Sequence, residues 1–305
     1  VSATAQVNGG FKDIGGQVYY LNRDNRLNYG GIIGHIPYRS AGTTRTTEGD
    51  IAIVNQRVFY DRIAGILEYP FSQNRRMEFT TGFTRISYDY EARIYDFDTG
   101  ETNIRELPQP DPLNLVQTSI AYVGDYSFMG YTSPINGKRF RFEIEPNFGS
   151  LRYMTATADY RNYAFANPFT FAFRLMHYGR YLKDAEDTRQ SSLYLGYETL
   201  VRGYNASSFN SDQRTQTDDI AFENIVGSRI GLFNAEVRVP LFGTEEYGLI
   251  NARFLPTELL AFVDGGVAWT KTEQPDWEWT TTPDSRVPVF SAGIGARVNL
   301  FGYIV

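Results

Sequence analysis

The sequence predicts an all-β protein, a transmembrane antiparallel β-barrel of about sixteen strands, an even number as is usual for single-chain bacterial barrels. Three observations predict this fold: apolar residues recur at every second position, several of these segments are long, and short turns alternate with long polar connections. Barrel strands alternate because one face meets lipid and the other meets the lumen. A soluble β-sandwich also alternates, but its strands average about 5–6 residues, whereas a tilted membrane strand needs about 9–11.

The composition agrees with a barrel and excludes several other classes of protein. The chain has 22 Tyr and 22 Phe but only 3 Trp, and rings suit both strands and the aromatic girdles at membrane interfaces. The mean hydropathy of -0.36 is compatible with a membrane protein because alternating strands carry little mean hydropathy. The net charge of -6 argues against nucleic acid as a partner. The absence of Cys excludes disulfides and thiolate metal sites.

The alternation is clearest in five segments, in which apolar residues two apart share one face of a strand. In the last of them Phe290, Ile294 and Val298 are apolar, while Arg297 and Asn299 stand on the opposite face. Each segment is therefore expected to present one face to lipid and the other to the lumen. In chain order the five segments are residues 140–144, 169–175, 231–239, 259–269 and 290–300.

Candidate strands can be placed along the whole chain from the same pattern. The one that begins near Met77 continues to Tyr90, so its tail is expected to project beyond the bilayer. Because this pattern can split or miss one or two strands, we estimate the number of strands as about sixteen. The candidates begin near Ala3, Gln17, Leu27, Ile51, Ala64, Met77, Leu113, Lys138, Leu151, Phe169, Ser191, Gly231, Leu259, Val289 and Phe301.

The connections between these strands alternate in length. A short turn at residues 147–150 contrasts with long polar stretches at 97–112, 206–222 and 271–286, as expected when turns gather at one rim and loops at the other. Residues 301–305 are interpreted as the first half of a last strand that is cut off. Without a linker, an internal repeat or a low-complexity block, residues 1–305 are expected to form one barrel domain, preceded by a periplasmic module upstream of Val1.

Three C-terminal motifs form an ordered set: LVRGY at 200–204, NAEVRVPL at 234–241 and FVDGG at 262–266. In this order they resemble the bacterial surface-antigen barrel, the superfamily that includes BamA and TamA. The closing segment GIGARVNLFG at 293–302 is similar to the penultimate strand and last turn of that family. Any one motif alone is a weak signal, whereas the ordered set, which covers roughly the last third of the chain, is a strong one.

The resemblance implies that a long sixth loop folds back into the lumen, where the Arg of its tip meets acidic groups on the barrel wall. The alternation independently places Glu236 and Asp264 on the face opposite the apolar one, and hence in the lumen. A guanidinium fork can bond two carboxylates at once, which a Lys ammonium cannot. The plainer alternative is a lumenal charge network that only stiffens the wall. The expected site residues are Val201, Arg202, Gly203 and Tyr204 in the loop tip, Glu236 and Asp264 as lumenal partners, and Phe262 and Gly266 in the partner strand.

Relatives in this superfamily mostly insert or translocate other proteins, so the resemblance implies that function for this chain. The proposed mechanism uses the seam between the first and last strands, whose exposed edges can pair with an incoming strand. The seam residues are expected to be Ala3, Gln6 and Asn8 in the first strand and Phe301 and Tyr303 in the last.

Other functions are weighed against this one. The main alternative is a membrane anchor or export pore for an attached periplasmic or surface domain, and a passive solute pore is disfavoured because the folded-back loop plugs the lumen. An enzyme is not expected, because His35 and His177 are the only histidines and no nucleophile and base form a motif. We expect no cofactor and no metal. The expected partners are the bilayer and lipopolysaccharide of a Gram-negative outer membrane, client proteins, and periplasmic or lipoprotein subunits, but no nucleic acid.

Overall fold

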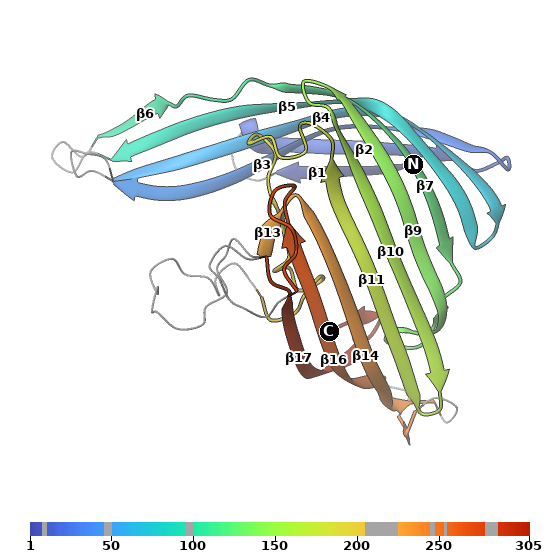
Figure 1. Ribbon diagram of the computed structural model, residues 1–305. Coiled ribbons are helices and arrows are strands. Elements are labelled where there is room, and N and C mark those ends of the chain that lie inside the picture. The colour runs from blue at the N-terminus through green and yellow to red at the C-terminus, as the bar shows by residue number, and fades with distance from the viewer. Residues whose placement is uncertain are drawn as a thin grey trace. The chain divides into compact units, whose positions relative to one another are not determined.

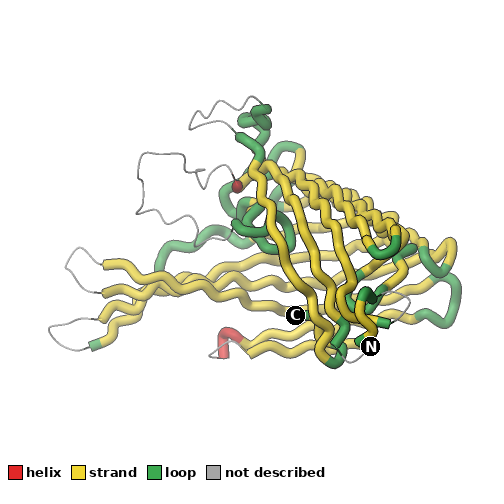
Figure 2. Tube along the Cα trace, turned by 90° about the horizontal axis from the view of Figure 1, so that it is seen from below, coloured by secondary structure: helices red, strands yellow, loops and turns green. Residues whose placement is uncertain are grey.

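The computed structural model describes residues 1–7, 11–45, 51–95, 101–204, 225–244, 248–252, 255–277 and 286–305. Nearly all regular structure in these residues is strand, with one 3₁₀ helix, η1 (Phe11–Asp13), drawn in red in Figure 2. Within the same residues, no helix is long and apolar enough to span a membrane.

The strands of the first half of the chain are β1 (Ser2–Val7), β2 (Ile14–Asn22), β3 (Asn28–Arg45), β4 (Ile51–Ser72), β5 (Arg75–Tyr95), β6 (Thr102–Glu106), β7 (Leu113–Asp125), β8 (Phe128–Met129) and β9 (Pro134–Gly149). Those of the second half are β10 (Tyr153–Ala166), β11 (Phe169–Tyr181), β12 (Leu193–Tyr194), β13 (Val226–Gly227), β14 (Arg229–Gly243), β15 (Ile250–Asn251), β16 (Thr257–Trp269), β17 (Val289–Leu300) and β18 (Tyr303–Ile304).

Sixteen of these strands form one sheet: thirteen follow in the order β1-β2-β3-β4-β5-β7-β9-β10-β11-β14-β16-β17-β18, and β6, β8 and β15 pair with β5, β9 and β14. The other two, β12 and β13, form a separate two-stranded sheet. Strands that are neighbours in this order are also consecutive along the chain once the short strands are set aside, so the topology is an up-and-down meander. The described residues therefore confirm an all-β, mainly antiparallel fold of about sixteen strands.

Three predicted strand starts need correction. The strand expected near Ser191 is only the two-residue β12, which pairs with β13 outside the main sheet. No strand begins at Ala64, because the ladder between β3 and β4 runs without a break from Arg45↔Ile51 to Asn28↔Glu68. The last strand begins at Tyr303 instead of Phe301. Phe301 and Gly302 have φ values of 53° and 98° and form the tight turn between β17 and β18, as positive φ at both central residues requires.

Contacts between Cα atoms group the chain into two compact units. The first comprises Val1–Pro70, Glu78–Ile120 and Glu145–Tyr153, and the second comprises Phe71–Met77, Ala121–Ile144 and Met154–Val305. Several strands, such as β4 and β9, contribute residues to both units. That residues 1–305 form a single domain stays a prediction.

The first unit holds a buried ion-pair network beside η1. Arg57 Nε donates to Asp13 Oδ1 over 3.0 Å, and Arg57 Nη1 lies 3.2 Å from Glu91 Oε1. At the edge of this network the exposed Lys12 Nζ lies 2.9 Å from Asp89 Oδ2. These bonds tie η1, which joins β1 to β2, onto β4 and β5. Buried charges of this kind remain stable only when they are paired in this way.

The second unit places β11, β14, β16 and β17 side by side (Figure 1) in antiparallel register, with one register shift between β14 and β16 at Pro240–Phe242. The chain between β11 and β14 returns to one face of these strands. There, its Leu195, Val201 and Ile225 pack with Ile230, Ala268 and Val289 into a fully buried apolar cluster. This cluster fixes the position of the candidate site described below.

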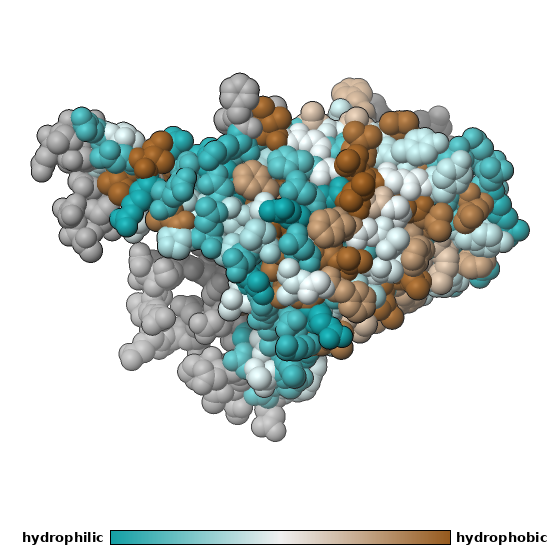
Figure 3. All heavy atoms as spheres, turned by 90° about the horizontal axis from the view of Figure 1, so that it is seen from above, coloured by the Kyte–Doolittle hydropathy of each residue, from teal (hydrophilic) through white to brown (hydrophobic). Residues whose placement is uncertain are grey.

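The two faces of the strands differ as the alternation predicts. On β11, Phe169, Phe171, Phe173 and Leu175 are exposed, whereas Thr170 and Ala172 between them are buried. On the surface drawn in Figure 3, brown apolar side chains gather in patches among teal hydrophilic ones. An exposed apolar face of this extent is unusual for a soluble protein and is the surface that a membrane strand presents to lipid.

The outward face predicts a depth-dependent response to charge. Leu175, 49% exposed in the middle of β11, and Leu249, 57% exposed in the connection after β14, form a matched pair. In lipid vesicles Leu175→Arg is expected to lower the free energy of unfolding by about 2–4 kcal/mol, and Leu249→Arg by about 0–1 kcal/mol. Equal losses in a denaturant titration of the two variants contradict the lipid-facing assignment.

Candidate functional site

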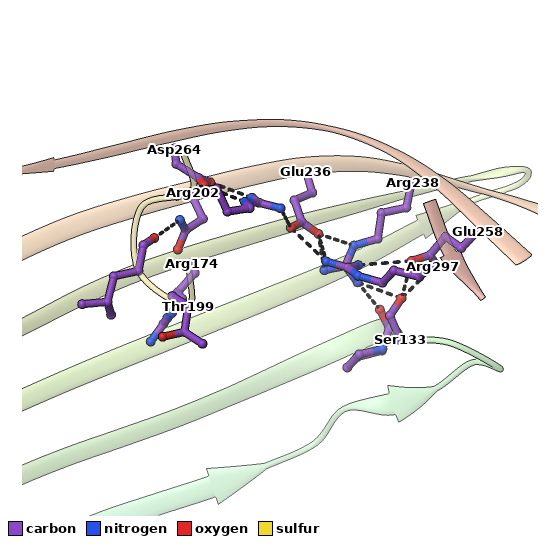
Figure 4. Close-up of polar contacts among 12 residues, drawn as sticks. Ser133, Arg174, Thr199, Arg202, Glu236, Arg238, Glu258, Asp264 and Arg297 are labelled. Atoms are coloured by element: carbon purple, nitrogen blue, oxygen red, sulfur yellow. Dashed lines mark hydrogen bonds and ion pairs between the residues drawn. The ribbon is translucent and has the colours of Figure 1, made fainter. Parts of the chain in front are cut away.

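The loop tip of residues 201–204 lies against the polar face of β14, β16 and β17 (Figure 4). Val201 is fully buried in the apolar cluster at the base of the loop. Its burial therefore fixes the position of the Cα atom from which the Arg202 side chain extends. Leu200 and Tyr204 pack against the same cluster from either side. The tip is thus seated by burial of apolar area on both sides of Arg202.

Arg202 bonds both acidic residues that the sequence analysis assigns to it. Its Nε and Nη2 donate to Asp264 Oδ2 and Oδ1 over 2.6 and 2.7 Å, and its Nη1 donates to Glu236 Oε1 over 2.6 Å. The backbone N–H of Arg202 also donates to Asp264 Oδ2 over 3.2 Å. The bond to Asp264 is bidentate, the strongest arrangement for a guanidinium and a carboxylate.

The register of the sheet sets the spacing of the two carboxylates. Asp264 on β16 stands opposite Asn234 on β14, two residues before Glu236. Asp264 and Glu236 are therefore diagonal neighbours on one face, about 7–8 Å apart at the backbone. One guanidinium reaches both because it carries donors on two edges of a plane. Its flat face covers the ring of Phe262, whose centroid is 3.6 Å from the guanidinium carbon, a cation–π contact.

These bonds contribute to stability because the two carboxylates are buried. The side chain of Asp264 has no solvent exposure, and that of Glu236 is also buried. Burial alone lowers the pKa of Arg202, but its bonds to Asp264 and Glu236 outweigh that effect and raise the pKa above its ordinary value. Arg202 is therefore charged at every accessible pH, and its removal leaves an unpaired buried carboxylate.

Two glycines allow the tip to approach the wall. Gly203 has a φ of +86°, which an L side chain rarely adopts. A Cβ on Gly266 would lie 2.8 Å from Val201 Cγ2 and 3.1 Å from Leu195 Cδ2, so β16 accepts the loop only because residue 266 has no side chain. Next to Gly203, the Tyr204 hydroxyl donates to the carbonyl oxygen of Phe290 over 2.7 Å.

Strand side chains also hold the loop backbone. Arg174 Nη1 on β11 donates to the carbonyl oxygen of Thr199, and Asn234 Nδ2 on β14 donates to that of Leu200, each over 2.8 Å. Two different strands thus hold the two residues that precede the tip in the sequence. Arg174 in turn is paired with Asp159 Oδ2 at 2.9 Å.

The base of the loop is tied by a carboxylate outside the strands. Glu186 Oε1 accepts from the Ser228 hydroxyl over 2.7 Å and from the backbone N–H of Lys271 over 2.6 Å. Burial raises the pKa of Glu186, but these two bonds and the nearby charges of Arg229 and Lys271 outweigh it, so the pKa is lowered. The residues on either side of the loop are thus held to the connection after β16.

Further residues that the alternation places on the lumen face find partners in the structure. Arg238 and Arg297 both bond Glu236, at 2.6 and 3.1 Å, and Arg297 also reaches Glu258 at 3.2 Å. The alternation marks Arg238 and Arg297 as inward-facing, but their pairing depends on the strand register. Glu258 had no signal beyond its place at the start of a strand.

The structure brings all the expected loop-tip and wall residues into one site, whereas the expected seam residues lie elsewhere. Ala3 and Gln6 belong to β1, Tyr303 belongs to β18, and Phe301 lies in the turn before it. Asn8 and the loop residues 206–222 lie outside the described residues. Gln6 Nε2 donates to the carbonyl oxygen of Pro37 on β3 over 3.0 Å.

The site holds charge pairs and a polar cavity. The cavity has a volume of about 420 Å³ and is lined by five arginines, each paired with a carboxylate, together with Glu198 and Glu236. In the described part of the chain, no group of three or more His, Asp or Glu side chains is arranged to hold a metal ion. By ion pairs and hydrogen bonds, this arrangement can fix the loop tip against the polar face of the strands. The five arginines are Arg161, Arg174, Arg202, Arg238 and Arg297.

Comparison with known proteins points to one family. The model of the Omp85 superfamily domain matches residues 57–300. The fold is similar to that in the crystal structure of BamA from Haemophilus ducreyi lacking POTRA domains 1–3, with a TM-score of 0.53 and 13% identity over 97% of this chain and 63% of that one. CdiB from Acinetobacter baumannii is similar with a TM-score of 0.53 and 12% identity, over 93% of this chain and 44% of that one. No curated protein matches.

These matches confirm the barrel fold class and the resemblance on which the sequence analysis relied. At 12–13% identity the two structures establish the fold alone. The chain spans less than two thirds of the length of either.

The close approach at Gly266 gives one prediction. Gly266→Ala places a methyl group against the stiff Val201 side chain and is expected to destabilise the protein by about 1–3 kcal/mol while raising protease access to residues 206–222. Gly295→Ala on β17 is the control, because its Cβ would meet Leu260 at an ordinary 3.7 Å. The same loss in both variants contradicts a specific contact between loop and strand.

The ion pair gives a second prediction. Arg202→Ala leaves Asp264 buried without its partner and is expected to cost about 3–5 kcal/mol, measured by denaturant unfolding in vesicles. Arg202→Lys keeps the charge but loses the bidentate geometry, so it should recover only part of that loss. Arg161→Ala is the control, because Arg161 lines the same cavity and pairs with Asp159. Unchanged protease access to residues 206–222 in Arg202→Ala argues against pinning.

Proposed function

Because the chain belongs to the Omp85 superfamily, we propose that it is a barrel of a Gram-negative outer membrane that assists the insertion or translocation of other proteins, without a chemical step. The observation that carries the proposal is the bidentate bond of Arg202 to Asp264. The exposed apolar face is the surface for the bilayer and lipopolysaccharide.

The bonded loop favours this function over a passive pore. Loop residues 199–204 are held on the polar face by Arg174, Asn234, Asp264 and Glu236 and by the Phe290 carbonyl. A loop held by so many bonds occupies the face along which solutes would move. A passive pore needs an open path for solutes, which this loop obstructs. A protein that inserts or translocates other proteins can instead use a fixed inner surface.

The edges of the sheet are the proposed point of contact with a client. Strands β1 and β18 stand at the two ends of the strand order. An edge strand presents unpaired N–H and C=O groups, to which an incoming strand can add by β-augmentation. In this proposal Ala3 and Gln6 of β1 and Tyr303 of β18 lie at the seam, and Phe301 contributes through the turn that orients Tyr303. Periplasmic or lipoprotein subunits are proposed as further partners.

The alternative is an anchor or export pore for an attached periplasmic or surface domain. One similar structure is that of a BamA lacking POTRA domains 1–3, and this chain covers 63% of it. A module beyond the matched region therefore occurs in a protein that shares this fold. An anchor needs the same lipid face, so the effect on client proteins distinguishes the two functions.

The test is the refolding rate of an unrelated, urea-unfolded outer-membrane barrel in liposomes with and without this protein. We expect insertion to be several-fold faster with the protein present and the gain to be lost in Arg202→Ala, while Arg161→Ala keeps it. Circular dichroism verifies that each variant is folded. If the folded protein leaves the client's rate unchanged, the insertion proposal is wrong and the anchor or export function takes its place.

A further inference from the structure

A second connection in the same unit folds onto the strands that hold the loop. Residues 126–133, between β7 and β9, turn back so that the backbone N–H of Gly130 donates to the carbonyl oxygen of Ser133 over 2.8 Å. The carbonyl oxygen of Tyr131 then accepts from Asn299 Nδ2 on β17 over 2.7 Å. In the strand order β10, β11, β14 and β16 separate β9 from β17. The turn of residues 130–133, here called the inner turn, therefore reaches across the polar face.

Ser133 links the inner turn to two charged residues of the wall. Its hydroxyl donates to the Glu258 carboxylate, whose oxygens lie 2.8 and 2.9 Å away, and accepts from Arg238 Nη1 over 3.0 Å. Arg238 Nη1 also donates to the carbonyl oxygen of Pro134 over 3.1 Å. All three side chains are buried, so each bond replaces water that these groups would otherwise need.

The inner turn is also packed. Thr132 is 7% exposed and Ser133 is 5% exposed. The space left between the turn and Pro240, Phe242 and Pro256 is about 20 Å³, room for no more than a single water. A turn seated this closely moves only if its polar bonds are broken together.

One carboxylate, Glu236, serves both the loop and the inner turn. Glu236 accepts from Arg202 of the loop over 2.6 Å and from Arg238, which holds the turn, over 2.7 Å. Arg297 bridges Glu236 and Glu258 at 3.1 and 3.2 Å. Figure 4 shows the resulting chain of bonds from Asp264 to Ser133. Its charges are three arginines (Arg202, Arg238 and Arg297) and three carboxylates (Asp264, Glu236 and Glu258), so it is balanced, and release of Arg202 leaves the buried Asp264 without its partner.

The two ends of this chain lie toward opposite ends of the strands. The loop joins β14 at its first residue, Arg229, whereas Arg238 lies five residues before the last, Gly243. Ser133 likewise directly precedes β9, which begins at Pro134. This chain of bonds from Asp264 to Ser133, here called the relay, therefore runs along the polar face from the loop toward the inner turn.

We propose that the inner turn, like the loop tip that Arg202 bonds, acts as a latch that holds a connection on the polar face. It is coupled to the loop through Glu236, with Ser133 and Arg238 as its positioning residues. Release of Arg202 frees an oxygen of Glu236, to which Arg238 or Arg297 then turns. This shift weakens the bonds of Arg238 and Glu258 to Ser133. The coupling concerns how two connections communicate, and it holds whether or not the protein inserts clients.

The test uses a thiol in the inner turn of the full chain in vesicles. Because the sequence has no Cys, Thr132→Cys is labelled by a water-soluble maleimide at one site only. Ser133→Ala is expected to raise the labelling rate at least about threefold by undocking the turn. Arg202→Ala, which touches no residue of the turn, is expected to raise it by a similar factor, within the range of coupling measured for residues in one network. Arg161→Ala is the control and should leave the rate unchanged.

Reciprocity gives a second readout. Since coupling between two sites acts in both directions, Ser133→Ala should raise protease access to residues 206–222 although Ser133 is remote from the loop. If Ser133→Ala leaves the labelling rate unchanged, the latch is overturned. If Ser133→Ala raises that rate but folded Arg202→Ala and Arg202→Lys do not, the turn is a latch without coupling and the relay is overturned.

Discussion

The buried carboxylate of Asp264 is the constraint on which the rest of the site depends. A charge with no solvent exposure is stable only when it is paired and hydrogen-bonded, and the groups that pair it come from the loop: the guanidinium of Arg202 and its backbone N–H. The wall therefore needs the loop as much as the loop needs the wall. This mutual requirement selects one position for a long connection whose own sequence has little tendency to form regular structure.

Other features follow from that requirement. Gly266 leaves room for Val201, and the positive φ of Gly203 turns the chain so that Tyr204 reaches the backbone of β17. The second carboxylate, Glu236, is surrounded by Arg202, Arg238 and Arg297 and so carries the effect of the loop farther along the polar face. Many apolar residues lie on the outer face, where lipid is the solvent. On the inner face, one apolar cluster seats the base of the loop, and ion pairs fix the position of its tip.

Much of this could be predicted from the sequence. Alternation is a local property, so it identified the strand faces and placed Glu236 and Asp264 inward, and the ordered motifs pointed to Arg202 as their partner. What alternation lacks is register. Whether Arg297 reaches Glu236 or Glu258 depends on pairings such as Glu258↔Arg297, and the inner turn with Ser133 depends on contacts between residues more than 100 positions apart. The false strand start at Ala64 has the opposite cause, since local pattern cannot show that a ladder continues.

The most direct test of the account is a double-mutant cycle between Arg202 and Asp264, measured as free energies of unfolding in vesicles. Arg202→Ala leaves Asp264 buried without its partner, and Asp264→Ala leaves Arg202 with Glu236 alone, whereas the double change removes both members of the pair. The account predicts that the double variant loses far less than the sum of the two single losses, with a coupling of about 1–3 kcal/mol. Additive losses would contradict it, because they would mean that the two residues stabilise the protein independently and that the loop is held by something other than this ion pair.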